Sequence, residues 1–246
     1  MKRFVVRSVA EIIEKVEALF SSEEHVVFRG QAEQGNLLPG IAREHPMLNS
    51  VELEKAMLRQ LQLQGCALLG EARSDLDCLV AAQHYGMKTR LLDWSGSMLA
   101  AAWFACSDYE KGDVYIYCLP TKGLINANVY ERGPFDFRAT KVFQPRLSNE
   151  RVSVQDGWFT LHAYSNKSAR YVSLERNAII KTKLVELRIP AETRPAILKG
   201  LSRCGVGKRT LFPGLDGLCQ HLNGTVYSHH FELMPTPAAD EEEEYN

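Results

Sequence analysis

The sequence predicts an α+β fold in which helices pack around a mixed, mostly antiparallel sheet. Helical spacing of apolar residues dominates the first part of the chain, and most strand patterns come later. There is no internal repeat and no regular alternation of strand and helix, which disfavours a doubly wound sheet. A chain of 246 residues with 45% hydrophobic and 24% charged residues can bury a sizeable core without disulfides. We therefore expect one domain over residues 1–239 and an acidic, disordered tail over residues 240–246.

Charge and cysteine usage exclude several classes of protein. The formal net charge is −1, and the acidic run at residues 240–244 makes the rest of the chain mildly basic, which is too little to indicate nucleic-acid binding. Six scattered cysteines without a CxxC pair predict free thiols in a reducing cytoplasm and no metal site. No apolar run is long enough to span a bilayer, so we expect no membrane partner.

Three helices are expected before the middle of the chain. Ser8 and Glu11 form a capping box ahead of an apolar stripe with helical spacing. A second helix extends to Gln64. The third starts at Ser74 and ends at Tyr85, and Gly86 follows it in the position that favours a left-handed residue. A short strand over residues 26–29 separates the first two helices.

The stretch over residues 82–106 organises the rest of the chain. Residues 89–94 read as a buried strand that runs into a helix, for which Ser95 or Ser97 is the cap. The small residues of this helix let it pack close to a sheet. An arginine and an aspartate inside one short strand are costly unless they are paired or used in chemistry. An internal ion pair between Arg90 and Asp93 is the structural alternative to a functional role.

The second half of the chain contains most of the strands. We expect an irregular insertion or lid with exposed aromatic residues over about residues 122–149. Alternation over residues 151–155 predicts a strand with Gln155 on its polar face. The remaining expected elements are strands over 114–119, 158–162, 181–189 and 226–234, and helices over 193–203 and 213–222.

Several motifs of the chain resemble the FRG domain family. They are Phe28-Arg29-Gly30, Leu38-Pro39 with Arg43, the block Gln83-His84-Tyr85-Gly86 with Thr89-Arg90-Leu91-Leu92-Asp93-Trp94-Ser95, residues 149–159, and Leu211-Phe212-Pro213 with Leu215-Asp216-Gly217. The resemblance covers most of the chain. Lys88 departs from the proline that the family usually places before its Thr-Arg pair.

The order of elements also resembles an ADP-ribosyltransferase core. That resemblance implies that Arg29 holds NAD, that the strand over 89–95 and its helix wall the nicotinamide site, and that a late strand supplies Glu150 or Gln155 for catalysis. It further implies a toxin or phage-defence effector that transfers ADP-ribose from NAD to a protein or nucleic acid. The cofactor-binding residues would be Arg29, Gly30, Gln31, His84, Tyr85, Thr89, Arg90, Asp93 and Ser95.

Several of these residues also have a structural interpretation. The guanidinium of Arg29 matches a pyrophosphate, with Gly30 allowing close approach, but a salt bridge at a strand end is the alternative. His84 and Tyr85 would bond a ribose and stack on a ring, or else close a helix and fill the core. Gln155 lacks the carboxylate of a general base.

Two functional hypotheses therefore stand. The first is an NAD-dependent ADP-ribosyltransferase-like enzyme, and the second is a non-catalytic module that senses a nucleotide or a partner through the same cleft. Both predict that Arg29, His84 and Gln155 converge on one cleft beside the strand over 89–95. Polar side chains that border apolar strands need a common solvated site.

Overall fold

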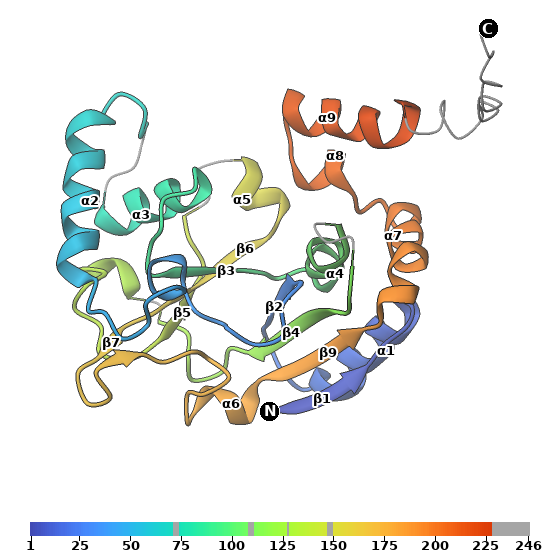
Figure 1. The fold of residues 1–246 in the computed structure, drawn as a ribbon, viewed down its shortest axis with the longest axis horizontal. Helices are drawn as coiled ribbons and strands as arrows, with labels where there is room; N and C mark the ends of the chain where they lie inside the picture. Colours follow the sequence, from blue (N-terminus) through green and yellow to red (C-terminus); the bar gives the residue numbers. More distant parts are fainter. Residues whose placement is uncertain (71–73, 108–110, 127, 147–149, 228–246) are drawn as a thin grey trace, which may run out of the picture.

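The computed structural model describes residues 1–70, 74–107, 111–126, 128–146 and 150–227. Its centre is a mixed sheet in which β1 runs parallel to β9 and the other neighbours are antiparallel (Figure 1). The predicted α+β class is confirmed. In spatial order, the strands are β1 (Lys2–Val5), β9 (Val185–Ile189), β4 (Val114–Pro120), β2 (Val26–Gln31), β3 (Leu91–Ser95), β6 (Gly157–Leu161) and β5 (Lys141–Phe143).

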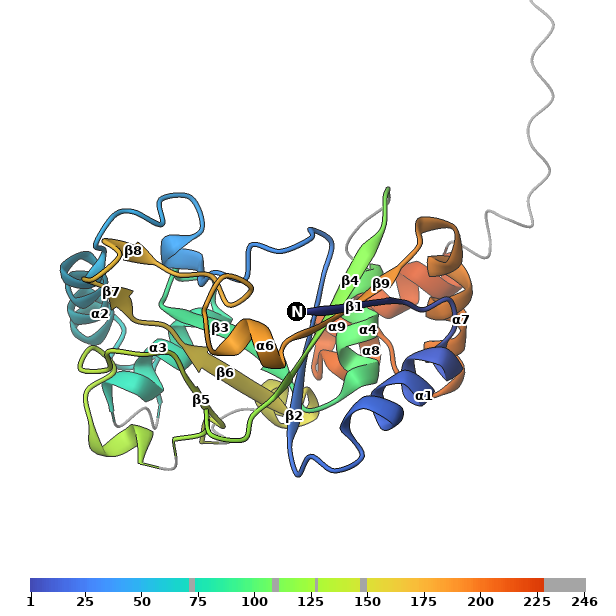
Figure 2. The same ribbon diagram turned by 90° about the horizontal axis from the view of Figure 1, so that it is seen from below.

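Helices cover the two halves of this sheet separately (Figure 2). The half that contains β2, β4 and β9 packs against α1 (Val9–Phe20), α4 (Met98–Ser107) and α7 (Arg194–Arg203). The half that contains β3, β5 and β6 packs against α2 (Val51–Gln64) and α3 (Asp75–His84). None of the helices in the described ranges has the length and apolar character needed to cross a membrane.

The smaller elements lie at the periphery. A two-stranded ribbon joins β7 (Tyr164–Ser165) to β8 (Arg170–Tyr171). The short helices are α5 (Glu150–Val154), α6 (Ile180–Lys183), α8 (Lys208–Leu211) and α9 (Leu215–Leu222), with 3-10 turns at Gly40–Ala42, Val129–Glu131 and Ala191–Thr193 and a π-helical turn at Asn223–Tyr227.

The sheet opens between β2 and β3. β2 pairs with β4 along its whole length, and β3 pairs in the same way with β6. Between them, β2 and β3 pair at one position, Phe28 opposite Ser95, and then diverge (Figure 1). Main-chain groups and side chains on both sides of this opening therefore face a space that an ordinary sheet would close.

Gly30 allows α4 to pack directly on β2. A Cβ atom at Gly30 would lie 1.8 Å from the carbonyl oxygen of Ala101 and 2.6 Å from the nitrogen of Ala105. Both are main-chain atoms of α4, so neither can move aside cheaply. The close packing of the small-residue helix is as expected, and the glycine makes room for this helix.

Two sequence-based assignments of secondary structure are wrong. Residues 151–155 were expected as a strand, but α5 covers Glu150–Val154; there Val152 is buried and Val154 exposed, so the alternation reflects a single helical turn. The strand expected over residues 226–234 is wrong at its two described residues, because residues 226 and 227 belong to the π-helical turn. Its remaining residues, and the tail over 240–246, lie outside the described residues.

Two further expectations are corrected in part. Residues 180–183 form α6, so the strand expected over 181–189 begins only at Val185. Aromatic residues between 122 and 149 were expected to be exposed, yet Phe137 and Phe143 are buried against α3 and β6. A large apolar ring has more to gain from a core than a loop-like composition suggests.

The expected ion pair between Arg90 and Asp93 does not form. Arg90 instead donates from Nε to Oε2 of Glu54 at 2.7 Å, and its main-chain nitrogen donates to Oε1 of the same carboxylate at 2.7 Å. Both side chains are buried, and the guanidinium also lies over the ring of Phe135. Burial raises the pKa of Glu54, and the charge of Arg90 opposes that rise. The pair ties α2 to the start of β3.

Candidate functional site

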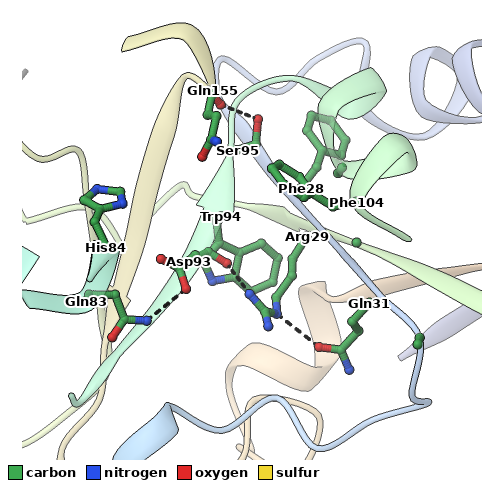
Figure 3. Close-up of a pocket in the computed structure, with 13 residues that line it drawn as sticks. Phe28, Arg29, Gln31, Gln83, His84, Asp93, Trp94, Ser95, Phe104 and Gln155 are labelled. Atoms are coloured by element: carbon green, nitrogen blue, oxygen red, sulfur yellow. Dashed lines mark hydrogen bonds between the residues drawn. The ribbon is translucent and has the colours of Figure 1, made fainter. Parts of the chain in front are cut away.

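A cavity of about 420 Å³ occupies the opening between β2 and β3 (Figure 3). Its volume lies in the range of small-molecule sites. Polar groups from β2, β3 and α3 meet aromatic rings from β2, β3 and α4 around it. The lining residues are Phe28, Arg29, Gly30, Gln31, Ala32, Gln83, His84, Asp93, Trp94, Ser95, Ala101, Phe104 and Gln155.

Arg29 supplies the positive charge of the cavity. Its Nη1 donates to the main-chain oxygen of Asp93 at 2.9 Å, and its Nε donates to Oε1 of Gln31 at 3.0 Å (Figure 3). The third nitrogen, Nη2, is bonded to none of the described residues. Burial lowers the pKa of Arg29, with the nearby Asp93 carboxylate acting in the opposite direction, and a guanidinium remains charged at neutral pH.

Gln31 connects Arg29 to the loop that follows β2. While its Oε1 accepts from Arg29, its Nε2 donates to the main-chain oxygens of Glu33 at 2.8 Å and of Gly35 at 2.6 Å. The nitrogen of Gly35 in turn donates to the hydroxyl of Tyr117 on β4 at 2.6 Å. The direction of the guanidinium is therefore set by a loop that is itself anchored to the sheet.

Asp93 is the one carboxylate among the lining residues. Its Oδ2 accepts from Nε2 of Gln83 at 2.9 Å. Gln83 is fixed in turn by Thr89, whose hydroxyl donates to Oε1 of Gln83 at 2.6 Å. Thr89 is fully buried, and its oxygen also accepts from the nitrogen of Leu91 at 3.0 Å.

His84 and Gln155 border the cavity on its other sides. The ring of His84 meets Phe159 edge-on, with 6.1 Å between the ring centroids. Ser95 donates from its hydroxyl to the main-chain oxygen of Gln155 at 2.6 Å, and Nε2 of Gln155 donates to the oxygen of Leu211 at 2.9 Å. Arg29, His84 and Gln155 thus converge on one cavity, as the sequence predicted (Figure 3).

The family model of the FRG domain matches residues 24–114. Over this range the chain is similar to the FRG domain. No curated protein and no solved structure matches the chain. The matched range runs from just before β2 to the first residue of β4, so it holds every cavity residue except Gln155.

Several predicted site residues lie outside the cavity. Tyr85 is 90% exposed, which places it neither in the core nor in the cavity. Thr89 and Arg90 are buried behind the cavity wall, where they hold Gln83 and Glu54. Glu150 is exposed at the start of α5 and does not line the cavity. The catalytic role assigned to Glu150 or Gln155 stays a prediction.

Sequence reasoning missed Gln83 and Phe104 as residues of the site. Gln83 stands next to His84 in the helix, and nothing in the local pattern shows that its amide reaches Asp93. Phe104 lies on the apolar helix α4 and looks like any core residue. Within the described residues, no group of three or more His, Cys, Asp or Glu side chains is placed to hold a metal ion.

Proposed function

We propose that the cavity binds NAD or a related nucleotide and that the FRG domain is an ADP-ribosyltransferase-like enzyme. The supporting observation is that Arg29, with Nη2 uncommitted, and Asp93 border the same opening of the sheet. A guanidinium matches the geometry of a phosphate, and a carboxylate accepts hydrogen bonds from sugar hydroxyls. Phe28 and Phe104 add apolar wall against which a ring can pack.

The proposed reaction breaks the bond between C1 of a ribose and the nitrogen of nicotinamide. The bonding electrons leave with nicotinamide, and the ribose is left with an oxocarbenium-like positive charge. A nucleophile of a protein or nucleic acid attacks that carbon and loses a proton. The domain would act by positioning and by stabilising charge. An effector role in toxicity or phage defence belongs to the same proposal.

Binding and turnover can be tested separately. Thermal shift and isothermal titration with NAD, ADP-ribose and ATP measure binding, and release of nicotinamide measures turnover. We expect NAD to stabilise the wild type and Arg29→Ala to remove that stabilisation. Arg59→Ala, which removes an exposed arginine of α2, is the matched control and should bind as the wild type does. A wild type that binds none of the three nucleotides would refute the proposal.

The second candidate is a non-catalytic sensor that binds a nucleotide in the same cavity. It is favoured by the segment over residues 150–155, whose one acidic residue does not line the cavity. Glu150 is exposed, and the side-chain amide of Gln155 donates to the main-chain oxygen of Leu211. Stabilisation by NAD without release of nicotinamide, with any acceptor offered, would establish the sensor over the enzyme.

A further inference from the structure

We propose that Asp93 binds the hydroxyl groups of a ribose, and that Gln83 and Thr89 are the positioning residues that orient its carboxylate. The inference rests on the proposed function, because it assigns a ligand group to the same cavity. It narrows the ligand to nucleotides that carry both a phosphate and a free ribose diol.

The orientation of Gln83 follows from the chemistry of Thr89. The hydroxyl of Thr89 accepts from the nitrogen of Leu91 at 3.0 Å, and its single proton is directed to Oε1 of Gln83 at 2.6 Å. The amide of Gln83 therefore has its oxygen on Thr89 and its NH2 group on Asp93. An amide turned the other way would set two oxygens, those of Gln83 and Asp93, against each other.

One oxygen of Asp93 remains for a ligand. Gln83 bonds Oδ2, and no described residue bonds Oδ1 of this cavity-lining side chain. A carboxylate accepts hydrogen bonds and donates none, so it selects groups that donate. Each carboxylate oxygen has two lone pairs, so the free Oδ1, together with the second lone pair of Oδ2, can accept from the two adjacent hydroxyls of a ribose.

The guanidinium of Arg29 does not bond the carboxylate of Asp93 directly. Arg29 donates to the main-chain oxygen of Asp93, and none of the ion pairs among the described residues joins the two side chains. The cavity consequently keeps Nη2 of Arg29 as a donor on β2 and Oδ1 of Asp93 as an acceptor on β3. A phosphate next to a ribose presents the complementary groups.

The test compares two kinds of probe on folded Asp93→Asn protein. Asparagine has nearly the same shape, can still accept from Gln83, and removes the charge. For NAD, ADP-ribose and ADP, which carry ribose, we expect affinity to fall about 10- to 100-fold, the range expected for losing a hydrogen bond to a charged group. For inorganic pyrophosphate we expect affinity to stay equal or to rise, because a negative charge has left the cavity.

A second pair of variants tests the positioning residues. Thr89→Val keeps the volume but removes the hydroxyl that orients Gln83, and we expect about 3- to 10-fold weaker binding of NAD with unchanged binding of pyrophosphate. Thr89→Ser restores the hydroxyl and should recover most of the affinity for NAD. Equal losses for both kinds of probe would show a merely structural role.

The outcomes separate this inference from the proposed function. If Asp93→Asn binds both kinds of probe more tightly, the carboxylate of Asp93 only repels the phosphate groups of the ligand, and the inference is overturned. If ADP binds in an Asp93-dependent way and NAD does not bind, the ribose assignment stands and the proposed NAD chemistry fails. A wild type that binds pyrophosphate but no ribose-bearing probe overturns the ribose assignment, and a wild type that binds no probe overturns both.

Discussion

The guanidinium of Arg29 on β2 bonds the main-chain oxygen of Asp93 on β3, with 2.9 Å between Nη1 and the oxygen. The two strands have already separated there, since their shared register position is Phe28 opposite Ser95. A side chain thus takes the place of a main-chain bond across the opening. The same residue holds the two halves of the sheet together and supplies the cation of the cavity.

Arg29→Lys should rescue little of what Arg29→Ala loses. A single ammonium cannot reach the oxygen of Asp93, the amide of Gln31 and a phosphate with fixed geometry. We expect at least about tenfold weaker binding of NAD for both variants. We also expect a loss of about 1–3 kcal/mol in the free energy of unfolding, because Gln31 and the main-chain oxygen of Asp93 lose their hydrogen bonds to the guanidinium. Titration calorimetry and denaturant unfolding measure the two effects. Wild-type affinity in Arg29→Ala would remove this residue from the site.

Glu150→Gln should leave release of nicotinamide close to the wild-type rate. Glu150 is exposed on α5 and outside the lining of the cavity, so its charge is screened from the proposed reaction centre. Gln155→Ala should reduce both binding and turnover modestly, because it removes a cavity-lining amide and leaves the carbonyl of Leu211 without this partner. The two variants are compared by steady-state kinetics. Loss of turnover with intact NAD binding in Glu150→Gln would restore the catalytic role that the resemblance implies.

Gly30→Ala should destabilise the fold strongly. The added Cβ would meet main-chain atoms of α4 at 1.8 and 2.6 Å, so the helix must move away from β2. Overpacking of this kind costs about 1–3 kcal/mol or more in the free energy of unfolding. Gly224→Ala is the matched control, since nothing lies within 4 Å of its added carbon. Equal stability of the two variants in thermal and denaturant unfolding would contradict the close packing of α4.

Stability should fall in mild acid because of His162. This buried side chain bonds the hydroxyl of Thr160 with 3.0 Å between Nε2 and Oγ1, and burial, with the charges of Arg29 and Arg90, lowers its pKa to about 3. Between pH 6.5 and about 3 the unfolded chain binds a proton that the folded chain does not, so the free energy of unfolding decreases as the pH falls.

The size of that loss can be measured by unfolding at several pH values. Each pH unit below 6.5 costs up to about 1.4 kcal/mol from this one group. His162→Gln should flatten the pH dependence, although it lowers stability at every pH. His45→Gln, which changes an exposed histidine, should keep the wild-type slope. A slope that survives in His162→Gln would assign the acid sensitivity to other groups.

Local chemistry made the elements around the site predictable. Ser74 and Asp77 form both bonds of a capping box at the start of α3, and Gly86, with a φ of 87°, follows its end. Both signals act within a few residues, so the sequence alone carries them. The run of small residues in α4 likewise predicted its close approach to a strand.

What the sequence determined by itself is therefore the α+β class, most helix ends, the buried strand β3 and the meeting of Arg29, His84 and Gln155 at one cleft. Only the tertiary structure decided the rest. Arg90 pairs with Glu54, 36 positions away, and the valines near Gln155 fall on a short helix in place of a strand. The opening between β2 and β3 depends on strand pairing between distant segments. Such contacts are settled by the packing of the whole chain, which no local pattern encodes.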